Sequence, residues 1–576
     1  MNRPPLGRLG VLFVVLVLGF TGIVIRLTFL QIRDSDAFEA LAKQQRLRTI
    51  DLPAGRGAIL DRDGRELAMS LDAADVYADP SLVEQPDKVA GQLAPLLGVP
   101  VGDLLTDLHD RSSTFVYLAR QVDDVVVEKI RKLELAGIGF LDVTKRYYPN
   151  GAMAPQVLGS VGIDGSGLSG LELEYQDQLA GRAGERVLEV DPHNHLIPQG
   201  ENFDQPPVPG SDVVTTIDRE IQYRCQLALA EAVRRNQAKG GTVIVMDPNT
   251  GDVLAMATYP SFDPEHFADY TTARLQNPAI VSVYEPGSVN KVITASAAIE
   301  DGVIPLDQRL EVPDFIGIDL AECPECIFHD AHTHPVEPMT IADIIAQSSN
   351  VGTIKLAQRV GQVRMAQYLA MFGLGQPTGV GFPGEQDGIL PSLPDWTIAS
   401  MGTIPVGQGV AVTPLQMAAV YAAVANDGVW IQPRLVRGFV DGDGTFHAAP
   451  AAETRRVVSA QTAKTVTRIL SFAVDAGTGN PAQIPGFWVA GKTGTAQIPK
   501  IHGTGYSNKY VASFIGFTPA SDPQLVIAAI IDRPVTEYGA VAAAPLFKEI
   551  GQWAIARLRI APAARPTLPP HLMSGG

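Results

Sequence analysis

An uncharged apolar run near the N-terminus places the strongest constraint on what this 576-residue chain can fold into. Residues 9–25 carry no charge, and apolar residues resume after Arg26 as far as Ile32. At 1.5 Å per residue, a helix over the whole stretch spans about 36 Å, enough for a hydrocarbon core of about 30 Å. Arg26 would lie near an edge of that core, where a long side chain reaches the headgroups. We therefore predict a transmembrane helix over residues 9–32.

A cleaved signal peptide is the alternative interpretation of this run. Residues 26–33, which follow it, lack the small-x-small pattern of a cleavage site, and this favours an uncleaved anchor. Basic residues flank the run on both sides, so the positive-inside rule does not decide the orientation. The short N-terminal side and the large mass that follows predict a cytoplasmic tail at 1–8 and an exported bulk.

The charge and cysteine content exclude two classes of protein. Lys and Arg total 45 against 62 Asp and Glu, which gives a formal net charge of −17. A general nucleic-acid binder needs a basic surface that neutralises phosphates, so we expect no nucleic-acid partner. Three cysteines are too few for the disulfide framework of a small secreted domain.

A proline-rich segment at 206–210 is the predicted boundary between two folded regions. An amphipathic helix is predicted over 33–47, followed by short strands and helices without internal repeats. This pattern predicts a mixed, strand-rich domain at 33–210, to which the resemblance described below adds an elongated shape.

The region after the boundary alternates helical and strand patterns. Its predicted elements are helices at 219–235 and 546–558 and strands at 241–246, 252–258, 487–497, 510–517 and 524–531. We expect an α+β domain at 211–560, with an antiparallel sheet built from both ends of the region and helices between them. The Pro- and Ala-rich residues 561–576 are predicted to be a disordered tail.

Ser288 and Lys291 lie three residues apart at the start of a predicted helix, so their side chains meet one turn apart on one face. A serine hydroxyl is a weak nucleophile until a neighbouring base takes its proton. Lysine is such a base only when burial and a second cation lower its pKa from about 10.4. Alone the spacing is weak evidence, because a chain of this length holds about one such pair by chance.

Two further motifs strengthen this interpretation. Ser348 and Asn350 lie in the turn between predicted helices at 340–347 and 351–360, from which both side chains can project into a cleft. Alone, this pattern would indicate only a helix N-cap. Residues 491–495 read Gly-Lys-Thr-Gly-Thr inside a strand pattern, where glycines often mark the close approach of a ligand or another backbone.

Ser-x-x-Lys, Ser-x-Asn and Lys-Thr-Gly, in this order and on a helix, a turn and a strand, match the signature set of penicillin-binding proteins and serine β-lactamases. Residues 56–64, 167–172 and 247–251 also resemble segments of class B penicillin-binding proteins, and the likeness covers roughly residues 9–560. The chain is similar to the division-type, FtsI-like members of that class, and the elongation type is the competing alternative.

The resemblance implies a peptidoglycan D,D-transpeptidase with a transmembrane helix, a pedestal domain and a β-lactamase-like transpeptidase domain. Ser288 would attack the D-Ala–D-Ala carbonyl of a stem peptide, and Lys291 would act as the base. Ser348 would relay a proton to the leaving group with electrostatic support from Lys492. Asn350 would hydrogen-bond the amide on the acyl side.

The resemblance also implies the rest of the binding site. Thr493, Gly494 and Thr495 would form the substrate-binding strand, with both threonine hydroxyls on the terminal carboxylate. The backbone N–H groups of Ser288 and Thr495 would form the oxyanion hole, where one donor contributes about 2.7–4 kcal/mol in related enzymes. No metal or organic cofactor would be needed.

The implied partners are peptidoglycan stem peptides, β-lactam antibiotics that acylate Ser288, the membrane, and a glycan polymerase of the SEDS family with other division proteins. The implied location is the bacterial cell membrane, with a single pass and an extracytoplasmic catalytic domain. A D,D-carboxypeptidase or β-lactamase, in which water replaces the acceptor amine, stays open as an alternative. So does a sensor or a non-catalytic division scaffold.

A cysteine- and histidine-rich segment is not explained by the resemblance. Cys323 and Cys326 are separated by two residues and followed by His329, His332 and His334. Such a group could hold zinc. A disulfide is the simpler state on the outer face of a membrane, and a solvated loop is simpler still. The sequence leaves these three states open.

Overall fold

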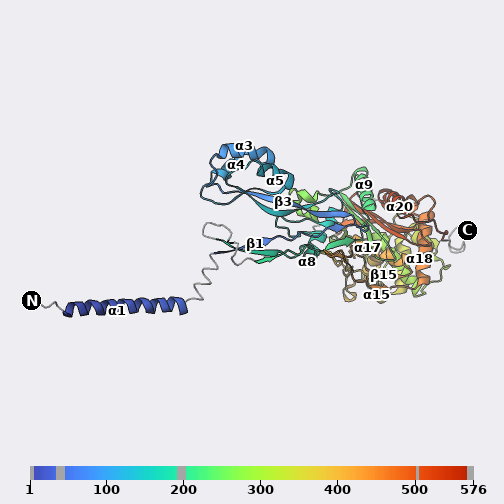
Figure 1. Ribbon diagram of the computed structural model, residues 1–576. Coiled ribbons are helices and arrows are strands. Elements are labelled where there is room, and N and C mark those ends of the chain that lie inside the picture. Colours follow the sequence, from blue (N-terminus) through green and yellow to red (C-terminus); the bar gives the residue numbers. More distant parts are fainter. Residues whose placement is uncertain are drawn as a thin grey trace, which may run out of the picture. The chain divides into compact units, whose positions relative to one another are not determined.

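The computed structural model describes residues 6–33, 46–190, 197, 203–500, 505–536 and 538–566 (Figure 1). The chain divides into two compact units. One comprises Met1–Gly55 and Gly181–Pro209, and the other comprises Arg56–Ala180 and Gly210–Gly576. The amphipathic helix expected over 33–47 and most of the tail expected at 561–576 lie outside the described residues.

The first unit contains the apolar helix that the sequence predicted. Helix α1 (Leu6–Thr28) continues into a π-helical turn at Phe29–Arg33. Among the described residues, Gly7–Gln31 is the one helical stretch that is long and apolar enough to cross a membrane. The same unit holds a small antiparallel sheet in which β6 (Gly184–Glu189) pairs with β1 (Leu47–Leu52) and β7 (Phe203–Gln205).

An antiparallel sheet of five strands forms the centre of the second unit, in the order β10-β9-β21-β20-β19. The strands are β9 (Gly240–Met246), β10 (Val253–Tyr259), β19 (Ala490–Pro499), β20 (Tyr506–Thr518) and β21 (Leu525–Asp532). Side chains alternate between the two faces of a strand. In β9, Val243 and Val245 are buried in one core while Ile244 and Met246 are buried in the other.

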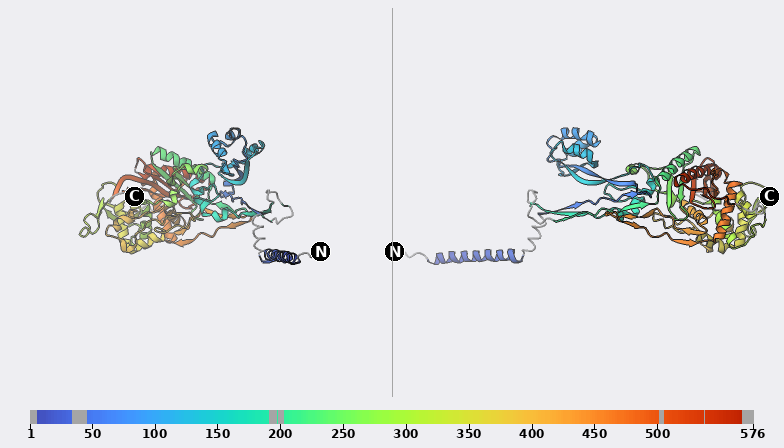
Figure 2. Two further views of the ribbon diagram at one scale, coloured as in Figure 1. Left: turned by 90° about the vertical axis from the view of Figure 1, so that its left-hand side faces the viewer. Right: turned by 45° about the vertical axis from the view of Figure 1, so that its right-hand side comes forward.

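Helices cover both faces of this sheet, which confirms the predicted α+β architecture. Helices α9 (Arg219–Arg235) and α20 (Ala544–Leu558) contact each other and pack on one face, as Figures 1 and 2 show in green and red. Helices α12 (Lys291–Glu300) and α17 (Pro414–Ala425) belong to the core on the other face. All twelve residues of α17 are buried, as expected for a helix that is apolar on every side.

A second, mixed sheet joins distant parts of the chain, in the order β17-β16-β8-β2-β3-β4 with β5 also paired to β3. Its strands are β2 (Ile59–Leu60), β3 (Glu66–Ala78), β4 (Val116–Asp123), β5 (Ile138–Tyr147), β8 (Asp212–Thr215), β16 (Val436–Val440) and β17 (Phe446–Ala448). The β2–β8 pair is parallel and the other pairs are antiparallel.

Three helices form a small apolar core with β3 and β4. They are α3 (Pro86–Leu97), α4 (Val101–His109) and α5 (Asp124–Arg131), which Figure 1 shows grouped together in blue. Leu93, Leu104 and Ile130 contribute one buried side chain from each helix.

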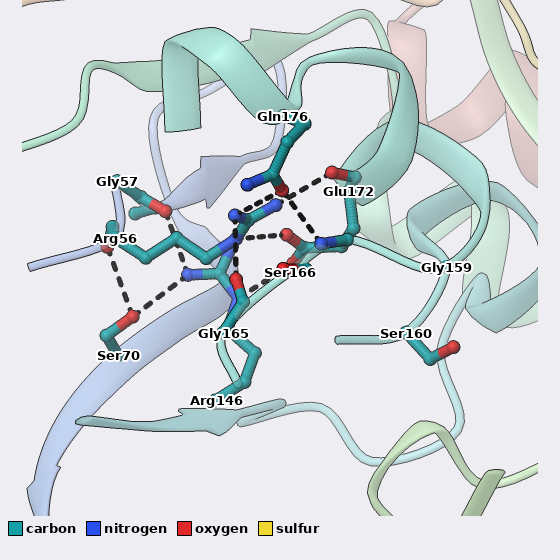
Figure 3. A network of polar contacts seen from close by, with 12 residues as sticks. Arg56, Gly57, Ser70, Arg146, Gly159, Ser160, Gly165, Ser166, Glu172 and Gln176 are labelled. Atoms are coloured by element: carbon teal, nitrogen blue, oxygen red, sulfur yellow. Dashed lines mark hydrogen bonds and ion pairs between the residues drawn. The ribbon is translucent and has the colours of Figure 1, made fainter. Parts of the chain in front are cut away.

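The segments 56–64 and 167–172 meet in a buried cluster of charges (Figure 3). Arg56 Nε donates to Glu172 Oε2 and Arg146 Nε donates to Glu172 Oε1, each at 2.7 Å. The Glu172 side chain is fully buried and the two arginine side chains are 5–6% exposed. Further bonds join Arg56 to the Glu172 carbonyl at 2.7 Å and to Gln176 at 2.8 Å, and Arg146 to the Gly57 carbonyl at 2.8 Å. The two arginines thus share one carboxylate, which leaves one net positive charge in the cluster, and Arg146 Nη2 is the one guanidinium nitrogen there without a hydrogen-bond partner in the described structure.

Candidate active site

The serine of the Ser-x-x-Lys motif lies in a 3₁₀ turn at Gly287–Asn290, which leads into α12. Gly287 adopts a left-handed φ of +59° and donates its N–H to the Gly407 carbonyl at 2.9 Å. A Cβ at Gly287 would lie 2.9 Å from the Thr495 carbonyl oxygen. A glycine is therefore required here, because β19 approaches the backbone just before Ser288 too closely for a side chain.

Polar bonds from the helical part of the unit fix this turn. The Tyr421 hydroxyl, from the buried helix α17, donates to the Val289 carbonyl at 3.0 Å. The Asn290 side-chain amide donates to the Ile404 carbonyl at 2.9 Å. Both bonds are buried, so losing either would leave a polar group without a partner.

Lys291 is fully buried, and its amine joins two motifs. Nζ donates to the Ser348 carbonyl at 2.6 Å and to Asn350 Oδ1 at 2.7 Å, and Ser348 Oγ lies at 3.4 Å. Burial lowers the pKa of Lys291 to about 7, against an opposing effect of the Asp330 carboxylate. A neutral amine has two hydrogens and one lone pair. Because the two oxygen acceptors use both hydrogens, the lone pair remains for a hydroxyl proton.

A second cation lies close enough to act on the lysine pair, as the sequence predicted. Burial is the first cause of the lowered pKa at both Lys291 and Lys492. The pKa of Lys492 falls well below its ordinary value because of burial first and Lys291 second. Both amines donate hydrogen bonds, and because repulsion between two cations is mutual, their proximity disfavours the charged form of each.

The Ser-x-Asn motif spans the junction of α13 (Ile341–Gln347) and α14 (Asn350–Val360). Ser348 ends α13 with a left-handed φ of +62°, and Ser349 is the N-cap of α14, accepting from the Gly352 N–H at 2.8 Å. The capping interpretation therefore applies to the middle residue of the motif. Ser348 and Asn350, on either side of it, are the residues that contact Lys291.

Asp330 organises this junction from a separate loop. Its Oδ1 accepts from the N–H groups of Asn350 and Val351, and its Oδ2 accepts from the Ser349 hydroxyl at 2.8 Å. His334 Nε2 lies 3.0 Å from the same oxygen, and the hydrogen bond raises the pKa of His334. A carboxylate at a helix N-terminus is favoured by the orphan N–H groups and the helix dipole.

The Lys-Thr-Gly motif lies on β19, the edge strand of the five-stranded sheet. Lys492 is buried and its Nζ donates to the Thr493 carbonyl and hydroxyl, both at 3.2 Å. The Thr493 hydroxyl lies 2.9 Å from that of Thr478. A Cβ at Gly494 would lie 2.2 Å from Ser513 Oγ, so this glycine too is required by close packing.

These elements enclose a cleft of about 430 Å³. It is lined by Ser288, Ser348, Asn350, Thr493 and Thr495 from the three motifs, and by Asp330, His332, His334, Thr478, Tyr538 and Gly539 among others. The Gly539 N–H donates to the Thr495 hydroxyl at 3.3 Å. Lys291 and Lys492 contact the cleft through the motif residues to which they are bonded.

The cysteine and histidine loop reaches the cleft through His332 and His334, which line it. Cys323 and Cys326 form a disulfide, which is one of the three states that the sequence left open. His334 bonds Asp330, while the His329 ring lies 5.9 Å from that of Phe315. Within the described part of the chain, no group of three or more His, Cys, Asp or Glu side chains is arranged to hold a metal ion.

Comparison with known protein families identifies two domains in the chain. A model of the penicillin-binding protein transpeptidase domain matches residues 241–552, and a model of the penicillin-binding protein dimerisation domain matches residues 51–215. The chain belongs to the class B penicillin-binding proteins. Similar proteins include penicillin-binding protein PbpB of Mycolicibacterium smegmatis, 35% identical over 96% of this chain and 89% of the relative. A probable peptidoglycan D,D-transpeptidase, PenA of Neisseria meningitidis, is 32% identical over 96% and 94%.

A solved structure supports the same assignment. Penicillin-binding protein 3 of Mycobacterium tuberculosis, in complex with aztreonam, is 34% identical with a TM-score of 0.71. The alignment covers 90% of this penicillin-binding protein and 99% of that chain.

Sequence reasoning missed three residues of the site in this penicillin-binding protein: Asp330, Thr478 and Gly539. Each acts through hydrogen bonds to segments fifteen or more positions away in the chain, so no local spacing identifies it. Asp330 stands four residues after Cys326, in a segment whose cysteines and histidines gave the stronger signal.

Proposed function

We propose that this penicillin-binding protein is a peptidoglycan D,D-transpeptidase of septal wall synthesis that works through a Ser288 acyl-enzyme. The proposal rests mainly on the burial, the lowered pKa and the hydrogen-bond partners of the Lys291 amine. This amine is buried, has a pKa of about 7, and contacts Ser348 and Asn350. A general base works best when its pKa lies near the operating pH.

The first half-reaction transfers the donor stem to the enzyme. Ser288 Oγ attacks the carbonyl between the two D-Ala residues while Lys291 takes the hydroxyl proton. The tetrahedral oxyanion accepts hydrogen bonds from the backbone N–H groups of Ser288 and Thr495. The C–N bond then breaks, D-Ala leaves with a proton relayed through Ser348, and an ester on Ser288 remains.

The second half-reaction forms the crosslink. An amine of a neighbouring stem attacks the ester carbonyl and loses a proton to the Lys291–Ser348 pair. The new amide forms as the C–O bond breaks, and Ser288 recovers its hydroxyl proton. The cycle exchanges one amide for another, so it needs no external energy source or cofactor.

The edge position of β19 supports the proposed way of binding. An extended stem peptide can pair with a free strand edge, so that its backbone is held by hydrogen bonds. The Thr493 and Thr495 hydroxyls would then bind the terminal carboxylate, with Lys492 behind them. Asn350 would bond the acyl-side amide from the opposite wall.

We further propose a pedestal at 33–210, a transpeptidase domain at 211–560, and an N-terminus in the cytoplasm. Peptidoglycan lies outside the membrane, so the catalytic cleft must be exported, and the apolar helix α1 fits a single anchor. The pedestal would dock a SEDS-family glycan polymerase and other division proteins.

Two measurements test the proposal. Full-length protein should be labelled covalently by a fluorescent penicillin, and Ser288→Ala should abolish the labelling. With lipid II and the partner polymerase, wild type should form crosslinked dimers while Ser288→Ala forms uncrosslinked glycan only. Labelling of Ser288→Ala contradicts the assignment, and release of D-Ala without dimers assigns a carboxypeptidase instead.

A further inference from the structure

A short strand beside the Ser-x-Asn motif lines the cleft but has no part in the proposed mechanism. Strand β14 (Glu337–Met339) pairs with β11 (Leu310–Val312) and leads directly into α13, which ends at Ser348. Side chains alternate along a strand, so Glu337 and Met339 share a face, and both line the cleft. Met339 is buried, whereas Glu337 is partly exposed. A molecule in the cleft can therefore contact the Glu337 side chain.

Two carboxylates of the described residues line the cleft, and only one of them has hydrogen-bond partners. Asp330 accepts from two backbone N–H groups and the Ser349 hydroxyl, and it contacts His334. No hydrogen bond or ion pair joins the Glu337 side chain to another described residue. The hydrogen bond to Asp330 raises the pKa of His334, and the Glu337 charge adds to this effect through space. No lysine or arginine of the described residues lines the cleft, so Glu337 is open to a cation from outside.

Glu337 belongs to the wall toward which the acyl part of a donor stem would extend. The Asn350 side-chain amide donates to the His329 carbonyl at 2.9 Å, so the segment that leads to β14 adjoins Asn350. In the proposed mechanism Asn350 bonds the acyl-side amide. The residue that precedes the D-Ala–D-Ala pair would then lie past Asn350, beside this segment. If that residue carries a side-chain amine, its ammonium can reach a carboxylate on the same wall.

We propose that Glu337 binds the side-chain ammonium of the donor stem, so that the enzyme prefers donors whose amine has not yet been crosslinked. This inference rests on the proposed transpeptidase function. A free ammonium brings a positive charge and three N–H donors to the carboxylate. Crosslinking converts it into a neutral amide with a single N–H, and such a donor leaves the Glu337 charge without a counter-ion. A stem that has already served as acceptor would therefore be a poorer donor.

The test compares two synthetic donors that differ only at the ammonium. Both are thioesters of Nα-acetyl-L-lysyl-D-alanine with thioglycolate, which keeps a terminal carboxylate, and in one of them the lysine ε-amine is acetylated. Attack of Ser288 releases thioglycolate, so kcat/KM for thiol release by full-length protein in detergent reports acylation. Wild type should use the ammonium donor about fivefold better, which is the effect of one partly exposed ion pair. This preference should shrink as salt is added.

Substitutions at Glu337 separate recognition of charge from the shape of the cleft. Glu337→Gln should lower kcat/KM for the ammonium donor about fivefold and leave the acetylated donor unaffected, so that the preference disappears. Glu337→Asp keeps the carboxylate and should keep a preference of about twofold or more. Glu322→Gln is the matched control, because it removes a carboxylate from the same loop at an exposed residue that does not line the cleft. It should keep the wild-type preference.

Covalent labelling by a fluorescent penicillin without an ammonium group reports on Ser288 separately. If wild type is neither labelled nor turns over the thioesters, the proposed function itself fails. If wild type is labelled but uses both donors equally well, only the role of Glu337 is overturned. That role is also overturned if Glu337→Gln keeps the preference, or if Glu322→Gln loses it to the same extent.

Discussion

Two regions of this penicillin-binding protein bury charge in opposite ways. In the cluster of Arg56, Arg146 and Glu172, two guanidinium groups share one carboxylate and their remaining donors mostly reach carbonyl oxygens. In the cleft, Lys291 and Lys492 are buried with neutral oxygen acceptors, and no carboxylate of the described residues forms a salt bridge with either amine.

The presence or absence of a counter-charge determines whether a buried group keeps its charge. A compensated buried charge is fixed in place, since removing one partner leaves the other without compensation. An uncompensated buried cation loses its proton instead. Lowering a lysine pKa from 10.5 to about 7 corresponds to a free-energy cost on the order of 5 kcal/mol, which the fold must supply. The first arrangement joins the segments that carry Arg56, Arg146 and Glu172, and the second suits Lys291 to the role of general base that we propose for it.

Replacing Lys291 by Met should produce the largest effect. The acylation rate by penicillin should fall about 10³- to 10⁴-fold, because the general base is lost. The free energy of unfolding should stay constant or rise, because a buried amine is replaced by an apolar side chain of similar length. Stopped-flow acylation and thermal unfolding measure the two effects. A variant that is inactive only because it is unfolded would contradict the comparison.

Replacing Glu172 by Gln should have the opposite effect: stability should fall while the acylation rate stays the same. Two buried guanidinium groups lose their counter-charge, so the free energy of unfolding should fall by about 3–5 kcal/mol. The acylation rate of the folded fraction should be unchanged. Asp142→Asn is the matched control, because Asp142 pairs with Arg131 at 3.4 Å where both side chains are exposed. That change should cost less than about 1 kcal/mol.

The pH dependence of acylation sharpens the assignment of Lys291. With a pKa of about 7, the neutral fraction rises about tenfold between pH 6 and pH 8, and the acylation rate should follow it. The unfolded state binds more protons between pH 7 and 10.5, so this group should make stability rise with pH over that range. A rate profile that is flat from pH 6 to 8 would show that Lys291 does not titrate there.

A substitution at Asp330 provides a control for the pH dependence of acylation, because the direction in which it should shift the Lys291 pKa is known. Because its carboxylate opposes the lowering of the Lys291 pKa, Asp330→Asn should move the midpoint to lower pH. A shift to higher pH would contradict the electrostatic role assigned to it.

The smallest expected effect is at Thr478, which bonds the substrate-binding strand without carrying charge. Thr478→Val should slow acylation about fivefold, because the Thr493 hydroxyl loses one hydrogen-bond partner. Thr478→Ser keeps the hydroxyl and should retain the wild-type rate. Equal loss in both variants would indicate packing rather than hydrogen bonding.

The sequence predicted those parts of the fold that follow from local periodicity. Helix α9 begins and ends at the predicted residues 219 and 235, and the five strands of the central sheet differ from prediction only at their ends. The nucleophile turn was expected as an α-helix and is a 3₁₀ turn, because the left-handed Gly287 and the nearby Thr495 carbonyl constrain it. The spacing of apolar residues along the sequence does not reveal a tertiary contact of this kind.

The three motifs were predictable because their spacing encodes their geometry, whereas polar contacts between distant segments were not. Arg56 and Glu172 belong to segments that the sequence singled out only by resemblance, and their salt bridge spans 116 positions. Asp330 and Thr478 likewise contact residues at least fifteen positions away. Charge compensation and hydrogen bonding across such separations depend on the folded chain as a whole.

The mixed sheet has a consequence for the order in which the chain can fold. Strand β8, at 212–215, is held between β2, at 59–60, and β16, at 436–440. During synthesis the β2–β8 pair can form early, but one edge of β8 stays unpaired until more than two hundred further residues have emerged. Long-range pairing of this kind is slow, because loop closure precedes the contacts that stabilise it. Until β16 has been synthesised, the exposed edge of β8 is a site for mispairing, so a strand in the middle third of the chain depends on a strand in the last third for protection.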